Sequence, residues 1–117
     1  MTKTGFSYGR QSRLTKRREF LDVYAKGEKV RTRYFYLYRM ENRLGRSRLG
    51  LTVSRKIGKT NLRNKLKRRL REIFRKNCAD SPHSYDLVVN VVRAAASAPY
   101  KSLEEEFIRA LGGYRWS

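Results

Sequence analysis

Residues 60–77 read TNLRNKLKRRLREIFRKN, and this stretch decides the fold more than any other part of the chain. Leu62, Leu66, Leu70 and Phe74 recur at every fourth position, while eight Lys or Arg side chains occupy other positions. This period predicts an amphipathic helix whose apolar stripe is buried against a sheet. The helix must then turn its cations outward or along its flanks.

The cations of this helix are too closely spaced to be explained by helix stability. Arg63, Lys67, Arg71 and Arg75 follow one another at intervals of four residues. Like charges at this spacing repel each other by a few tenths of a kcal/mol per pair. A ridge of this kind is instead typical of contact with closely spaced phosphates, although a solvated helix face is the alternative.

The charge of the whole chain supports an anionic partner. The 117 residues include 29 Lys or Arg and 10 Asp or Glu, which gives a net charge of +19. Residues 1–76 carry +20 of this charge and residues 77–117 carry −1. Arginine is frequent in the basic part, and its guanidinium suits phosphate oxygens and can stack on bases, so we expect a nucleic acid rather than a membrane.

The rest of the chain predicts a single α+β domain in the order α-β-β-α-β-α. Residues 16–27 predict a helix ended by a left-handed Gly27, and residues 34–40 and 48–54 predict an antiparallel hairpin joined through Gly45. Residues 86–92, DLVVNVV, predict a strand covered on both faces. A last helix over residues 102–111 begins with three Glu and stops at Gly112. We expect residues 1–12 to be a flexible basic arm and residues 113–117 a tail.

Aromatic residues form the second pattern that suggests binding. Alternation places Tyr34, Tyr36 and Tyr38 on one side of their strand, and the predicted hairpin would set them beside small side chains. Bases of a single strand stack on such rings. Phe20 and Tyr24, one turn apart on the first helix, would then supply a wall. A stripe of this kind also occurs in ordinary cores, so the spacing leaves both interpretations open.

Catalytic patterns are weak. The single histidine, His83, has no neighbour that suggests a triad, and Cys78 is typical of a small buried residue. Asp80, His83 and Asp86 are only a weak metal set, and we assign no metal site. The loop over residues 54–60 brings cations and backbone N–H groups to a helix start, as an anion site requires, but it does not match the spacing of a P-loop.

Three segments of the sequence resemble the protein subunit of bacterial ribonuclease P. They are Arg13-Leu14 with EFLDVY at residues 19–24 and Gly27, then GLTVSRKIG at residues 50–58, and above all RNKLKRRLRE at residues 63–72. The last segment is similar to the family's Arg-Asn-Arg motif, except that Lys65 stands at the second arginine. Charge is kept there, but a bidentate fork is lost.

The resemblance implies a two-layer sandwich like the second domain of ribosomal protein S5, with a left-handed β-α-β crossover. It also implies a division of labour in tRNA 5′ maturation. The catalytic RNA subunit performs the endonucleolytic cleavage with Mg²⁺ held mainly by RNA, and the protein binds that RNA and the 5′ leader of precursor tRNA. The residues implied for the leader cleft are Phe20, Tyr24, Tyr38, Ser54, Arg55, Lys56 and Arg93. Those implied to face the catalytic RNA are Arg63, Asn64, Lys65, Lys67, Arg68 and Arg71.

Two other functions compete with this hypothesis. A small basic ribosomal or RNA-chaperone protein would share the charge but need no leader cleft. A stand-alone nuclease would cleave with divalent metal and no RNA cofactor. No stretch of the sequence has the length and apolarity of a membrane span or a signal peptide, so we expect a cytoplasmic protein with no membrane partner and no small-molecule substrate.

Overall fold

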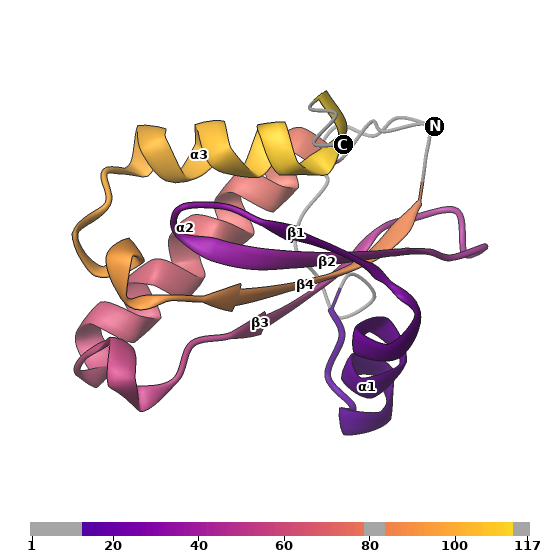
Figure 1. Cartoon of the computed structure of the whole chain (residues 1–117), viewed down its shortest axis with the longest axis horizontal. Helices are drawn as coiled ribbons and strands as arrows, with labels where there is room; N and C mark the ends of the chain where they lie inside the picture. The colour runs from indigo at the N-terminus through magenta and orange to yellow at the C-terminus, as the bar shows by residue number, and fades with distance from the viewer. Residues whose placement is uncertain (1–12, 79–83, 114–117) are drawn as a thin grey trace.

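The computed structural model describes residues 13–78 and 84–113 and shows one four-stranded sheet with helices on both faces (Figure 1). The elements run in the order α-β-β-β-α-β-α. They are α1 (Arg17–Lys26), β1 (Glu28–Arg31), β2 (Phe35–Glu41), β3 (Arg48–Thr52), α2 (Thr60–Cys78), β4 (Tyr85–Val91) and α3 (Tyr100–Ile108). Short 3-10 turns, η2 (Arg55–Ile57) and η3 (Arg93–Ser97), follow β3 and β4, and a π-helical turn, η4 (Arg109–Gly113), follows α3.

The strands lie in the order β1-β2-β4-β3. β4 is antiparallel to β2 and parallel to β3, so the predicted hairpin between β2 and β3 is wrong. β4 is buried along almost its whole length, and an apolar strand of this kind takes a central place in a sheet. The link after β2 therefore passes over the end of β4 to reach β3. The handedness of the β3-α2-β4 crossover stays a prediction.

β1 is an element that the sequence did not predict. Its four residues, EKVR, bury only Val30, and they pair with β2 at the edge of the sheet. A short edge strand with charged side chains resists pairing with other chains. A single buried residue is too little for a periodic pattern, which is why β1 was missed.

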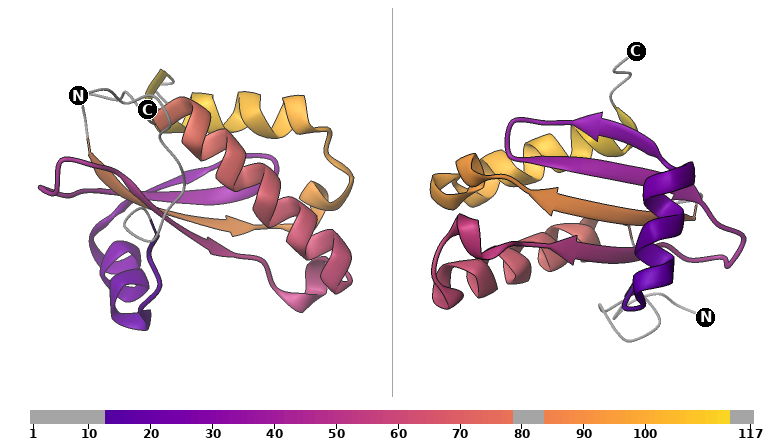
Figure 2. Two further views of the ribbon diagram at one scale, coloured as in Figure 1. Left: turned by 180° about the vertical axis from the view of Figure 1, so that it is seen from behind. Right: turned by 60° about the horizontal axis from the view of Figure 1, so that its bottom comes forward.

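α2 and α3 cover one face of the sheet, and α1 crosses the other (Figure 2). The predicted stripe of α2 is confirmed, because Leu66, Leu70 and Phe74 are buried in the larger core and Leu62 packs against it. Cys78 closes the stripe and is buried, as predicted. The sheet and its α2-α3 layer thus form the expected two-layer arrangement, and α1 leaves part of the opposite face for a site.

The ends of two helices differ from the predictions. Gly27 has a φ of −81°, so it is not left-handed. A Cβ atom there would lie 2.5 Å from the carbonyl oxygen of Val23, and close backbone contact is therefore the reason for glycine. α3 begins at Tyr100, which places Glu104 inside the helix, where it accepts from Asn77 (3.2 Å) and pairs with Lys76 (3.4 Å). Glu104 thus fastens α3 to α2, and the first turn of α3 holds no acidic residue.

The predicted flexible arm, residues 1–12, and residues 114–117 of the predicted tail lie outside the described residues. Gly113 belongs to the π-helical turn. Within the part of the chain that is described, no helix has the length and apolarity needed to cross a membrane.

Candidate nucleic-acid interface

The sheet face that α1 crosses carries two rows of side chains in register. One row runs Tyr38, Val88 and Gly50 across β2, β4 and β3, and the next runs Tyr36, Asn90 and Thr52. Residues paired in this way point to the same face. β4 therefore lies between the tyrosines of β2 and the small residues of β3, which the predicted hairpin would have set side by side.

Phe20, Tyr24 and Tyr38 form what we call the aromatic cluster. Phe20 and Tyr24 come from α1 and Tyr38 from β2. All three pack against a small core cluster that contains Val88, and they stay partly exposed. The Tyr24 and Tyr38 rings meet edge to face with their centroids 4.8 Å apart. The Tyr24 hydroxyl donates to Asn90 Oδ1 at 3.0 Å, which fixes the ring over the sheet.

Tyr34 does not belong to this face. It lies just before β2 and is buried in the core on the α2-α3 side, with 8% of its surface exposed. The prediction that Tyr34, Tyr36 and Tyr38 lie on one side of their strand is wrong for Tyr34, because β2 begins only at Phe35 and strand alternation does not extend before it. Tyr36 remains on the face and is half-buried.

The sheet face that carries the aromatic cluster and Tyr36, which we call the aromatic face, also holds two cations of β1 that were not predicted from the sequence. Lys29 Nζ lies 4.6 Å from the centroid of Tyr36 and 5.8 Å from that of Tyr38, and Arg31 Cζ lies 5.8 Å from Tyr36. Both side chains are exposed. Lys29 and Arg31 flank the buried Val30, and this strand alternation would have predicted that both share one face if β1 had been recognised. Cations over rings at a surface can bind a phosphate while the ring contacts a base.

Four predicted residues gather at the ends of the two parallel strands. Ser54, Arg55 and Lys56 follow β3, and Arg93 follows β4; all four are exposed. The turns η2 and η3 that carry them are in contact. Because parallel strands end at the same edge of a sheet, the topology brings the four together although Lys56 and Arg93 are 37 positions apart in the sequence.

The predicted cationic surface of α2 is partly exposed and partly built into the protein. Asn64, Lys65 and Arg68 are exposed, whereas Lys67 and Arg71 are partly buried. Arg63 Nε donates to the carbonyl oxygen of Gly58 at 3.1 Å and a terminal nitrogen donates to Thr60 Oγ1 at 3.2 Å. Arg63 therefore also ties the start of α2 to the preceding loop, a role that spacing did not indicate.

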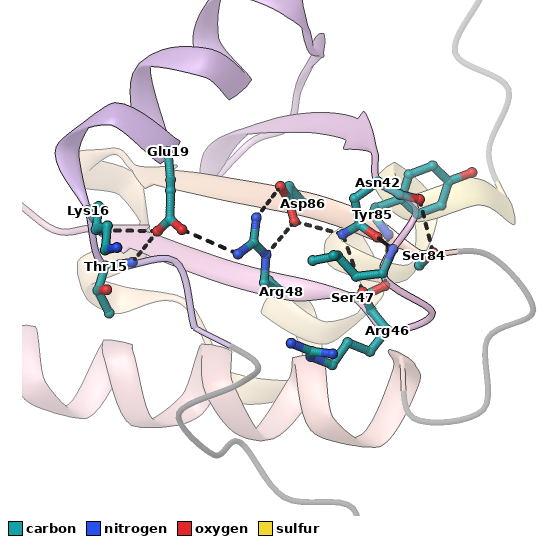
Figure 3. A network of polar contacts seen from close by, with 11 residues as sticks. Thr15, Lys16, Glu19, Asn42, Arg46, Ser47, Arg48, Ser84, Tyr85 and Asp86 are labelled. Carbon is teal, nitrogen blue, oxygen red and sulfur yellow. Dashed lines mark hydrogen bonds and ion pairs between the residues drawn. The ribbon is translucent and has the colours of Figure 1, made fainter.

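A polar network holds α1 on the sheet beside the aromatic cluster (Figure 3). Arg48 on β3 donates to both carboxylate oxygens of Asp86 on β4 at 2.8 Å, and it reaches Glu19 on α1 at 3.3 Å. Asn42 donates to Asp86 at 2.7 Å. Asp86 is buried, so this residue, which we considered as a weak metal ligand, serves as the anchor of Arg48.

Glu19 caps the start of α1. Its Oε1 accepts from the backbone N–H groups of Thr15 at 3.0 Å and Lys16 at 3.1 Å. Burial raises the pKa of Glu19, but these N–H groups together with Arg48 and Lys16 outweigh it and leave the pKa below its ordinary value. The hydrogen bond from Arg48 to Asp86, with the charges of Asp86 and Glu19, raises the pKa of Arg48 despite its desolvation.

No three His, Cys, Asp or Glu side chains gather to hold a metal ion anywhere in residues 13–78 and 84–113. Asp80 and His83 of the weak metal set lie outside those residues. Burial raises the pKa of the Cys78 thiol to about 12, which keeps it protonated and unreactive at neutral pH.

Comparisons with known proteins agree with this geometry. A family model described as Ribonuclease P matches residues 8–115. A ribonuclease P protein component from Thermotoga sp. (strain RQ2) is 45% identical over 103 residues, covering 88% of this chain and 81% of that protein. One from Clostridium botulinum (strain 657) is 35% identical, covering 87% and 93%.

Solved structures have the same fold. The RNase P protein of Staphylococcus aureus superposes with a TM-score of 0.79 at 31% identity, covering 86% of this chain and 92% of that one. The RNase P protein of Thermotoga maritima superposes with a TM-score of 0.78 at 34% identity, covering 88% and 97%.

Proposed function

This chain belongs to the ribonuclease P protein family, and from that premise we propose that it binds two RNAs on two different surfaces. The protein is a component of an endoribonuclease of tRNA 5′ processing and works with the RNA subunit of that enzyme. On our proposal, the aromatic face receives the 5′ leader of precursor tRNA, and α2 faces the catalytic RNA.

The observation that carries the leader assignment is the meeting of rings and cations on one sheet face. The aromatic cluster offers partly exposed rings, and Lys29 and Arg31 border them on β1. The exposed Arg55, Lys56 and Arg93 stand at the carboxyl ends of β3 and β4. A single strand needs both components, because its bases stack on rings while its phosphates pair with cations.

The surface of α2 suits a folded RNA instead. Asn64, Lys65 and Arg68 are exposed on an α-helix of 19 residues whose apolar stripe is fixed in the core, so the cations sit on a rigid support. Rigid, closely spaced cations match the phosphate backbone of a preformed RNA surface. Lys65 supplies charge there without the planar fork of an arginine.

We assign no catalytic group to the protein. The RNA subunit would carry out the cleavage, with Mg²⁺ held mainly by that RNA, and the protein would position the leader beside it. For this division of labour the protein needs rings that bind bases, cations on the leader surface and on α2, and a rigid helix. The described residues supply all three.

Reconstitution tests the proposal. Purified protein is added to a bacterial ribonuclease P RNA, and cleavage of precursor tRNA is followed over a range of Mg²⁺ concentrations. We expect the protein to lower the Mg²⁺ concentration needed for cleavage at the 5′ end of the mature tRNA. An unchanged Mg²⁺ requirement would contradict the proposal. Cleavage by the protein alone, in a preparation shown to be free of RNA, would support a stand-alone nuclease.

A further inference from the structure

A hollow of about 190 Å³ opens at the edge of the sheet beside β3, between residues 13–15 and α2. We call it the edge pocket. Its wall on one side is held to β3, because the Leu14 N–H donates to the carbonyl oxygen of Leu49 at 3.1 Å and Arg13 bridges to Leu49 in parallel. Leu14 is buried under α1 with Val23 and Val88. The pocket is therefore built by tertiary contacts rather than by a loose terminal segment.

Cations line the edge pocket from two sides. Arg13 lies on the terminal segment, and Lys67 and Arg71 lie one turn apart on α2. The side chains that line the pocket within the described residues include no carboxylate. Three positive groups around one hollow favour a ligand with an anionic group that accepts several hydrogen bonds, and phosphate is such a group.

The remaining lining of the pocket is largely apolar. Leu14, Leu51 and the ring of Phe20 contribute to it. Phe20 also belongs to the aromatic cluster, so the edge pocket lies between the two surfaces assigned to RNA. Pockets that enclose a whole small molecule measure roughly 300–1,000 Å³. A hollow of about 190 Å³ suits a smaller unit, such as a phosphate with its adjoining sugar.

We propose that the edge pocket binds one nucleotide of an RNA strand, with the phosphate between Arg13, Lys67 and Arg71 and the sugar against Phe20 and Leu51. This inference rests on the proposed function and adds to it a defined contact between the leader face and α2. The strand can belong to the catalytic RNA or to the precursor tRNA, and both offer the same phosphate and sugar.

Cross-linking identifies the RNA. Thr15 lines the pocket and is exposed, so Thr15→Cys places a thiol at its mouth. The one natural cysteine, Cys78, is buried with its pKa raised to about 12, and a benzophenone maleimide will label only the new thiol at pH 7.5. Lys101→Cys, exposed on α3, is the matched control.

The labelled proteins are irradiated in holoenzyme assembled with precursor tRNA. We expect Thr15→Cys to cross-link to one short run of nucleotides, either in the catalytic RNA or in the leader, and Lys101→Cys not to do so. Active holoenzyme in which Thr15→Cys cross-links no more than Lys101→Cys would overturn the edge pocket while leaving the proposed function standing. Failure of holoenzyme to assemble at all would count against the proposed function instead.

A blocking substitution gives an independent test. Thr15→Trp fills the mouth of the pocket and keeps every cation. Arg13→Gln removes the one described lining cation that lies outside α2 and keeps the pocket open. We expect each variant to weaken RNA binding about tenfold or more, the effect of losing charge-assisted hydrogen bonds. Lys101→Gln, one charge fewer on α3, should bind as the parent does. If Thr15→Trp folds, by circular dichroism, and binds RNA like the parent, the edge pocket holds no nucleotide.

Discussion

Gly50 sets how closely Phe20 can approach the sheet. A Cβ atom at this position would lie 2.6 Å from the Phe20 ring and 3.1 Å from Cβ of Leu14. We predict that Gly50→Ala pushes the ring away, lowers the free energy of unfolding by about 1–3 kcal/mol and weakens binding of precursor tRNA. Urea denaturation and a binding titration measure the two effects. Gly112→Ala is the control, because the nearest atom there is 3.9 Å away. Equal unfolding free energies and equal precursor-tRNA affinities for the two variants would show that the Phe20 ring does not pack on Gly50.

The rings of the aromatic cluster separate a leader-binding protein from a general RNA chaperone. We predict that Phe20→Ala or Tyr38→Ala weakens the binding of precursor tRNA by about 1–3 kcal/mol, which is the free energy of stacking one base on a ring. The binding of mature tRNA should change little. Leu21→Ala is the control, since Leu21 lies on the same helix with 48% of its surface exposed. Titrations of holoenzyme with both tRNAs decide the matter. Equal losses for the two tRNAs would favour the ribosomal or chaperone hypothesis.

Single residues show where sequence reasoning held and where it stopped. The type of residue at the candidate site was predictable, because rings and cations at helical or strand spacing are visible in the sequence. Their surroundings were not. Tyr34 shares the alternation of Tyr36 yet is buried in the core, and Lys29 was overlooked although it lies 4.6 Å from the Tyr36 ring. Tyr34 is buried by core residues that lie far away along the chain, whereas Lys29 lies only seven positions from Tyr36 but on β1, a strand that was not predicted.

α1 depends on charges buried beneath its start. Asp86 is 4% exposed, and Arg48 donates to both of its carboxylate oxygens. We predict that Arg48→Met lowers the free energy of unfolding by about 3–5 kcal/mol, because it leaves a buried carboxylate without its cation. Lys76→Gln breaks a pair with Glu104 in which the lysine is exposed, and it should lower the free energy of unfolding far less. Urea denaturation measures both, and comparable losses would mean that the Arg48 network does not anchor α1.

Acid should loosen the same helix through Glu19. Because the pKa of Glu19 in the folded protein lies below its ordinary value of 4.5, its contribution is complete above that value and is lost as the pH falls through the folded pKa. We predict that Glu19→Gln costs about 1 kcal/mol of unfolding free energy at pH 7, as lost helix caps do. The difference between the two proteins should shrink as the pH falls below 4.5. A difference that stays constant down to pH 3 would contradict the role of this carboxylate.

The elements were more predictable than their arrangement. α2 and β4 were predicted within one or two residues because each carries a long pattern of its own, a four-residue stripe in one and a continuous apolar run in the other. The pairing of β2 with β3 was predicted from proximity in the sequence and was wrong. β4 lies between β2 and β3 in the sheet and pairs with both of them. It lies more than 30 residues beyond β3 in the sequence, and local periodicity says nothing about such a distant partner.

The two helices that share one face of the sheet differ in charge. α3, which covers the sheet beside α2, carries three Glu among its nine residues and fastens to α2 through Glu104. The exposed cations at the ends of β3 and β4 and along α2 come from the first two thirds of the chain, with Arg93 as the exception. The net charge of +19 is therefore not a uniform coat. α2 and the turns after β3 and β4 carry the exposed cations that we assign to RNA, whereas α3 is acidic.

Such a distribution predicts a particular salt dependence. If α2 and the adjoining turns neutralise about six phosphates, the logarithm of the affinity for the catalytic RNA should fall with the logarithm of salt concentration at a slope of about −4 to −5. Removing the exposed cations Lys65 and Arg68 together, as Lys65→Gln with Arg68→Gln, should make the slope shallower by about 2, since each phosphate contact contributes about 1. Lys101→Gln on α3 should leave it unchanged, because that surface faces no RNA in the proposal. Titrations at four or more salt concentrations give the slopes. Equal changes for the α2 and α3 variants would show that charge acts without regard to position, and the assignment of α2 to the catalytic RNA would then be wrong.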